Sequence, residues 1–159
     1  MYIPFEQMPD HARVWIYQAN RPLTANETQL IKQTLEAGTH GWEAHGAPLQ
    51  ASFEIRYNQV IVVAVNESVN QASGCSIDAS TRWFKELAAN LNIDFFNRDL
   101  ALVRGESLEL IPIGQIKSQV QAGNIRPTDT LLRPLTDQIV SYRSEWLCPV
   151  NESYISRHF

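Results

Sequence analysis

Two short segments of the chain hold the side chains with the greatest capacity for chemistry. The first, residues 40–46, contains two histidines, a tryptophan and a closing glycine. The second, residues 73–78, has a cysteine between small residues and ends on an aspartate. A cysteine with a histidine in reach can perform nucleophilic or thiol chemistry, because the imidazole or a helix N-terminus favours the thiolate. We therefore treat the two segments as one candidate site.

Cys75 is the candidate nucleophile of this site. It comes just before a predicted helix, where free N–H groups and the helix dipole favour an anion. His45 is the candidate base or hydrogen-bond donor, and Asp78 is the candidate orienter or a helix cap. The alternative interpretation makes Cys75 a small buried residue and Gly74 a turn residue, since free cysteine is among the most buried residue types.

Six further residues are candidates for contact with a bound ligand. Small residues ahead of a helix hold phosphates or carboxylates through backbone amides, but the segment lacks the lysine that a nucleoside triphosphate needs. Trp42 is either a stacking wall for the ligand or, as we favour, a plug at the end of a hydrophobic core. The candidate ligand-binding residues are His40, Trp42, Gly46, Ser73, Gly74 and Ser76.

The sequence lacks the spacings that are typical of metal and cofactor sites. It has neither an HExxH nor a CxxC motif, which are the usual zinc signatures. Its seven glycines form no Walker A motif, no dinucleotide-binding fingerprint and no nucleophile elbow. We therefore expect neither a metal nor a cofactor.

Hydrophobic patterns predict the elements that must position these residues. A capping box of Thr24 with Glu27 predicts the start of a first helix, and Gly38 predicts its end. Ser76 or Asp78 is expected to cap a second helix. Strands are expected over residues 12–19, 49–57, 60–65 and 100–104. The order β-α-β-β-α-β is typical of the ferredoxin-like α+β fold, with two helices on one face of a four-stranded sheet.

This topology predicts that the two chemical segments meet. In a split βαβ arrangement the first two strands are parallel, and the third lies antiparallel between them. The loop before the second strand and the loop before the second helix then lie at the same end of the sheet. We therefore expect Cys75 and His45 to share one edge of the sheet.

The rest of the chain, residues 105–159, is expected to be a mainly helical extension. A short strand is predicted at 108–111, with helices over 113–122 and 136–146. We expect this extension to pack on the 1–104 core, which gives a single compact domain of ordinary size.

Composition narrows the classes of partner. The net charge of −4 and a pI near 5.5 argue against binding to nucleic acid or anionic membranes, which usually requires a basic face. The longest apolar run, residues 60–65, is too short to span a bilayer. With no signal-peptide pattern and two distant cysteines, we expect a soluble cytoplasmic protein with reduced thiols.

Two functions from different classes are compatible with the sequence. The first is a small-ligand or thiol-based catalytic site at the sheet edge. The second is a non-catalytic protein-interaction module or homodimeric subunit, because a ferredoxin-like sheet leaves one face uncovered by its own helices.

Three segments, residues 42–46, 72–80 and 93–98, together resemble a small bacterial family of uncharacterised proteins that often carry the label "ABC transporter ATPase". The resemblance covers most of the chain and implies no particular catalytic residue. The chain has no Gly-Lys pair, so it lacks the P-loop lysine that contacts nucleotide phosphates. We therefore expect that it is not an ABC-type ATPase. Residues 114–132, together with Glu145 and Trp146, also resemble the helix-then-turn half of GYF-like adaptor modules.

Overall fold

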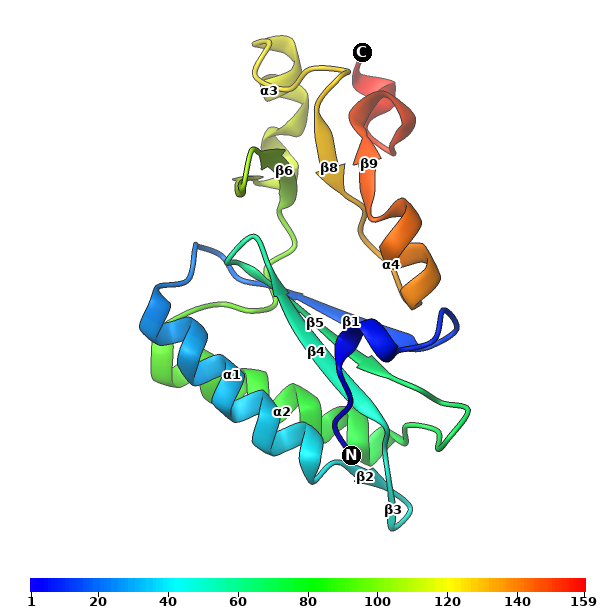
Figure 1. Ribbon diagram of the computed structural model, residues 1–159. Helices are drawn as coiled ribbons and strands as arrows, with labels where there is room; N and C mark the ends of the chain where they lie inside the picture. The colour runs from blue at the N-terminus through cyan, green and yellow to red at the C-terminus, as the bar shows by residue number, and fades with distance from the viewer. The chain divides into compact units, whose positions relative to one another are not determined.

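The computed structural model describes residues 1–159 and has a mixed α+β architecture, with four α-helices and three antiparallel sheets. The chain divides into two compact units (Figure 1). Unit 1 comprises Met1–Asn97 and Asp137–Val140, and unit 2 comprises Arg98–Thr136 and Ser141–Phe159. None of the helices has the length and apolar character that crossing a membrane requires.

A three-stranded antiparallel sheet organises unit 1. Its strands are β1 (Arg13–Gln18), β4 (Ala51–Arg56) and β5 (Val60–Val65), in the order β1-β5-β4. The predictions of these three strands are confirmed, including the antiparallel position of the third between the first two. All six residues of β5 are buried, which explains why this strand is apolar throughout.

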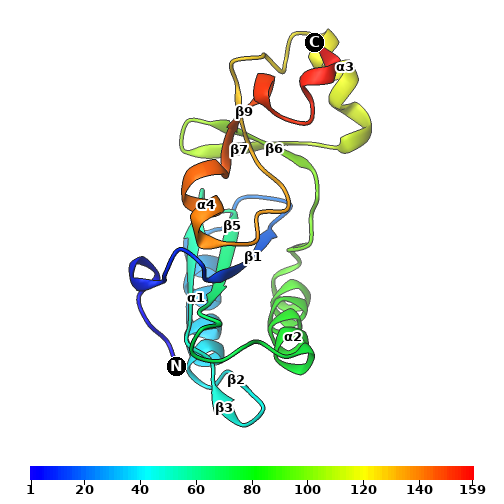
Figure 2. The same ribbon diagram turned by 90° about the vertical axis from the view of Figure 1, so that its right-hand side faces the viewer.

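Two long helices cover one face of this sheet. They are α1 (Ala25–His40) and α2 (Gly74–Leu91), and both views show them beside the sheet (Figure 1, Figure 2). Phe84 and Leu87 of α2 and Ile31 of α1 are buried in one core with Ile61 and Val63 of β5. The amphipathic spacing of the helices therefore sets which of their faces is apolar.

The capping box predicted for α1 is present. The Thr24 hydroxyl accepts from the Glu27 amide at 3.2 Å, and the Glu27 carboxylate accepts from the Thr24 amide at 2.9 Å. The same carboxylate takes two hydrogen bonds from the Arg21 guanidinium, at 2.9 and 2.7 Å. These bonds hold the pKa of Glu27 well below its usual range, to about 2, with the Arg21 bonds as the main cause.

The predicted end of α1 at Gly38 is wrong. The helix continues to His40, and Gly41 is its C-cap. Gly38 lies inside the helix because its missing side chain leaves room for Trp83. A Cβ atom on Gly38 would lie 2.8 Å from the Trp83 ring.

The predicted caps of α2, Ser76 and Asp78, are also wrong. Ser73 is the N-cap, and its hydroxyl accepts from the Ser76 amide at 3.1 Å. The Ser76 hydroxyl accepts from the Ser73 amide at 2.7 Å, which completes a capping box. Cys75 therefore lies in the first turn of the helix and not in the loop before it.

The loop before β4 contains a small hairpin that the sequence did not predict. It consists of β2 (Glu43–Ala44) and β3 (Ala47–Pro48). His45 and Gly46 form its turn with φ values of 54° and 77°, the left-handed backbone that a tight hairpin turn requires.

Unit 2 contains the four-stranded sheet β7-β6-β8-β9. The predicted strand at 100–104 exists, but it pairs here and does not extend the sheet of unit 1, so the four-stranded ferredoxin-like topology is not confirmed. Gly105, with φ of 66°, and Glu106 form a tight turn that folds residues 100–104 back on 107–111. The strands are β6 (Leu100–Arg104), β7 (Ser107–Ile111), β8 (Thr130–Leu132) and β9 (Leu147–Pro149).

Short helices complete the chain. The α-helices are α3 (Ile116–Gln121) and α4 (Ile139–Glu145), shorter than the expected segments 113–122 and 136–146. Whether the C-terminal part packs on the core as one domain stays a prediction. The 3-10 turns are Phe5–Gln7, Ile113–Gln115, Val150–Glu152 and Ser156–His158.

Candidate functional site

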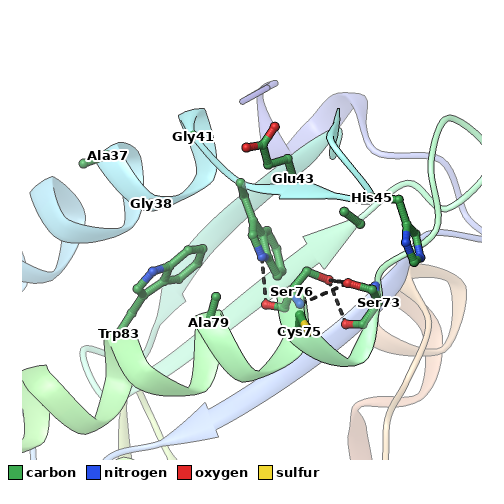
Figure 3. Close-up of a pocket in the computed structure, with 12 residues that line it drawn as sticks. Ala37, Gly38, Gly41, Glu43, His45, Ser73, Cys75, Ser76, Ala79 and Trp83 are labelled. Carbon is green, nitrogen blue, oxygen red and sulfur yellow. Dashed lines mark hydrogen bonds between the residues drawn. The ribbon is translucent and has the colours of Figure 1, made fainter.

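A pocket of about 430 Å³ opens in unit 1 where the end of α1, the hairpin strand β2 and the start of α2 meet (Figure 3). This volume lies in the range of about 300–1,000 Å³ that is typical of small-molecule sites. The residues that line it are Ala37, Gly38, Gly41, Trp42, Glu43, Ala44, His45, Ser73, Cys75, Ser76, Ala79 and Trp83.

One face of α2 forms a wall of the pocket. Cys75, Ala79 and Trp83 follow one another at intervals of four residues, so they lie along the same side of the helix. Cys75 is exposed, whereas Trp83 is partly buried. The wall therefore runs from an accessible thiol to an aromatic ring.

Trp42 closes the inner side of the pocket. Its side chain is only 3% exposed, and its indole N–H donates to the Ser76 carbonyl at 2.8 Å. The ring meets Trp83 in an edge-to-face arrangement, with centroids 5.1 Å apart, and its centroid lies 6.2 Å from that of Trp15. Trp42 therefore plugs the end of the core and lines the pocket as well.

Gly38 fixes the position of the Trp83 ring. A Cβ atom at this position would lie 2.8–3.1 Å from three carbon atoms of the indole, so the ring rests directly on the backbone of α1. Trp83 is thus held by Gly38 from one side and by Trp42 from another. An indole with so little freedom is a pre-organised surface for a ligand.

Asn70 ties the hairpin to the loop before α2. Its side-chain amide donates to the Ala44 carbonyl at 3.1 Å and to the Ala47 carbonyl at 3.0 Å. These two carbonyls flank the turn that carries His45. The predicted meeting of the two loops at one end of the sheet is therefore seen in direct contacts between them.

Five of the nine predicted site residues line the pocket. Figure 3 shows Trp83 and Gly38 toward one end, and His45 and Ser73 toward the other. The thiol of Cys75 and the imidazole of His45 share the pocket, and no hydrogen bond joins them. The predicted residues that line it are Trp42, His45, Ser73, Cys75 and Ser76.

The other four predicted residues lie outside the lining. His40 ends α1, where its ring stacks on Tyr2 at 5.6 Å and its Nδ1 lies 2.6 Å from the Glu36 carbonyl oxygen. Asp78 is exposed on α2, beyond the first turn. Gly46 forms the hairpin turn and Gly74 is the first residue of α2.

The electrostatic character of the lining is weak. It contains one carboxylate, Glu43, and no lysine or arginine. At the start of α2, the amides of Ser73, Ser76 and Ile77 are already engaged in capping and helical bonds. The chain contains no group of three or more His, Cys, Asp or Glu side chains arranged to hold a metal ion.

Sequence reasoning missed the apolar half of the pocket. We expected Trp83 to be a core residue and Gly38 to end a helix. The overlooked signal is the four-residue spacing of Cys75, Ala79 and Trp83, which places them on one helix face. A second overlooked signal is the group of small residues near the end of α1, which also line the pocket: Ala37, Gly38 and Gly41.

Comparison of the chain with protein-family models, with curated proteins and with solved structures finds no match. The resemblance to a bacterial family therefore stays a prediction.

Proposed function

We propose that unit 1 binds a small molecule in this pocket, with the Cys75 thiol in contact with it. One observation carries the proposal: a pocket of ligand-binding size has an accessible thiol beside a fixed aromatic wall. Such a combination of an apolar lining with a few polar groups is typical of small-molecule sites. A free thiol at this place fits the reducing cytoplasm that we inferred from the sequence.

Covalent labelling of Cys75 tests whether the pocket binds small molecules. The Cys75 sulfur displaces chloride from the CH2 carbon of a chloroacetamide, which forms a C–S bond while the thiol proton goes to solvent. With N-benzyl-2-chloroacetamide, we expect the rate to saturate as the probe concentration rises, because the probe occupies the pocket before it reacts. With 2-chloroacetamide, which is too small to fill the pocket, we expect a linear dependence. Mass spectrometry measures both rates.

A matched pair of substitutions tests whether the saturation of Cys75 labelling arises from binding in the pocket. Ala79→Leu fills the lining with a larger side chain, so saturation with the benzyl probe should disappear while the reaction with 2-chloroacetamide persists. Ala89→Leu makes the same change at an exposed position of the same helix, outside the lining, and should behave as the wild type. Saturation that survives Ala79→Leu would show that the pocket is not the binding site.

We propose thiol catalysis as a second candidate function, because Cys75 and His45 line the same pocket. In this version the sulfur bonds to the carbonyl carbon of an acyl substrate while the C=O π electrons move to the oxygen, and the thiol proton passes to the His45 imidazole. The carbonyl re-forms as the bond to the leaving group breaks, and the imidazole gives its proton to that group. His45→Ala should then slow Cys75 alkylation by 2-chloroacetamide at neutral pH and change its pH profile. His40→Ala, an exposed histidine outside the lining, is the control. Identical profiles for His45→Ala and the wild type would contradict the base role.

A further inference from the structure

The position of the Trp83 ring indicates which chemical class of ligand the pocket binds. This inference rests on the proposed function. The indole lies against the backbone of Gly38 and edge-to-face with Trp42, and these contacts limit the room that the ring has to turn. Trp83 is nevertheless only partly buried, and it lines the pocket. A flat ring surface held in place favours a second flat ring, because aromatic pairs add attraction beyond the area that they bury.

The side chains around this ring leave a slot with little polar character. Ala37 and Gly41 of α1 and Ala79 of α2 line the same pocket, and none of them projects beyond a methyl group. These three residues therefore give the lining an apolar part without hydrogen-bonding side chains. Among the polar members of the lining, His45 and Ser73 lie toward the other end, and Glu43 lies between the two ends (Figure 3).

The charge of the lining limits the ligand further. A phosphate or carboxylate on the ligand would lose hydration on entry, and a cationic side chain in the lining would offset this cost. The lining supplies no lysine or arginine, and it contains one carboxyl side chain, that of Glu43. An anionic ligand is therefore disfavoured.

We propose that the pocket takes an uncharged, planar aromatic group that packs against Trp83, and that Gly38 determines this specificity by setting the place of the indole. A side chain at position 38 would displace the Trp83 ring and change the width of the pocket beside it. Gly38 is a positioning residue in this proposal, since it acts through Trp83.

Three chloroacetamides of similar reactivity and size test the ligand class. They carry a benzyl group, a cyclohexylmethyl group and a 4-carboxybenzyl group on the amide nitrogen. We expect the benzyl probe to half-saturate Cys75 labelling at a concentration several-fold lower than either of the others. Equal half-saturation by the benzyl and cyclohexylmethyl probes would overturn the aromatic preference, and equal or tighter binding of the carboxybenzyl probe would overturn the charge preference.

Two glycine substitutions test the role of position 38. Gly38→Ala should raise the half-saturating concentration of the benzyl probe several-fold, because the added Cβ displaces Trp83. Gly114→Ala is the control, since it makes the same change in unit 2, outside the pocket. A Cβ atom at this position would meet nothing within 4 Å. An unchanged benzyl constant in Gly38→Ala would contradict the positioning role.

A change of the ring itself provides an independent check. Trp83→Leu should remove the difference between the benzyl and cyclohexylmethyl probes, while 2-chloroacetamide, which measures thiol access alone, should react as before. If the benzyl probe keeps its advantage in this variant, the ring does not select the ligand. The wild-type comparison needs no variant, so the inference remains testable if Trp83→Leu fails to fold.

The outcomes separate this inference from the proposed function. If all three probes saturate with equal constants, small molecules bind in the pocket but the aromatic specificity is wrong. If none of them saturates, the proposed function itself fails.

Discussion

At the residue scale, Gly38 combines two opposed effects on stability. Replacing a helical glycine by alanine normally stabilises a helix by about 1 kcal/mol. Here the new Cβ would lie 2.8 Å from an indole carbon, and overpacking of this kind costs about 1–3 kcal/mol. We expect Gly38→Ala to lower the free energy of unfolding relative to Gly41→Ala, measured by urea denaturation.

Gly41 is the reference for this comparison of unfolding free energies, because an alanine there adds the same methyl group without a close contact. An alanine there would make only an ordinary contact at 3.9 Å, so the change should be within about 0.5 kcal/mol of neutral. If Gly38→Ala proves at least as stable as Gly41→Ala, the Trp83 ring moves aside at no cost, which would contradict the fixed wall.

At the scale of elements, the start of α1 should make stability depend on pH. Glu27 has a folded-state pKa of about 2, below its ordinary value of 4.5, because Arg21 and the Thr24 amide bind the carboxylate. A lowered pKa means that the charged form stabilises the folded state. This contribution is fully present above about pH 4.5 and is lost as the pH falls toward 2.

Glu27→Gln isolates the charge, because glutamine can still complete the capping box. At pH 7 we expect a melting temperature about 1–3 °C below that of the wild type, the size expected for a solvent-accessible ion pair in a chain of this length. The difference should shrink as the pH is lowered from 5 to 2. Glu36→Gln, an exposed glutamate on the same helix, is the control. A difference that does not change with pH would contradict the role of the charge.

The hairpin β2–β3 should depend on a single side chain of another segment. Asn70 donates two hydrogen bonds to its carbonyls, and each is worth about 0.5–1.5 kcal/mol. We expect Asn70→Ala to speed amide hydrogen exchange in residues 43–48 by about tenfold, since local opening becomes easier. Exchange in the middle of α2 should not change and serves as the internal reference. Equal exchange at the hairpin in both proteins would show that the contact with Asn70 does not hold it.

Local sequence signals predicted those elements whose ends depend on neighbouring residues. Thr24 and Glu27 lie three residues apart and form the expected capping box. The strand at 100–104 was also predicted, but its pairing partner was not. We expected it to pair with β1, which is distant in the sequence, whereas the turn at Gly105 pairs it with the adjacent strand β7. Gly38 was misassigned for a related reason: its role depends on Trp83, which is distant in the sequence. Cys75 and His45 were predicted to lie near one another because the strand directions place their two loops at the same end of the sheet, and both residues line the pocket.

At the scale of the whole molecule, the candidate site is confined to one unit. All of the lining residues fall between positions 37 and 83, inside unit 1. Unit 2 has a hydrophobic core of its own, which includes Leu102, Ile116 and Leu131. The proposed small-ligand site therefore consists of residues of unit 1 alone.

The two cysteines should differ sharply in reactivity across the molecule. Cys75 is exposed in the pocket, whereas Cys148 of unit 2 is only 2% exposed, and its sulfur accepts from the Arg133 guanidinium at 3.3 Å. Because alkylation needs an accessible thiolate, iodoacetamide should label one cysteine of the native protein and both in denaturant. Peptide mass spectrometry identifies the native site, and in Cys75→Ser we expect no rapid labelling at all. Rapid native labelling of Cys148 would mean that the core of unit 2 opens, and a slow reaction at Cys75 would remove the thiol from the proposed site.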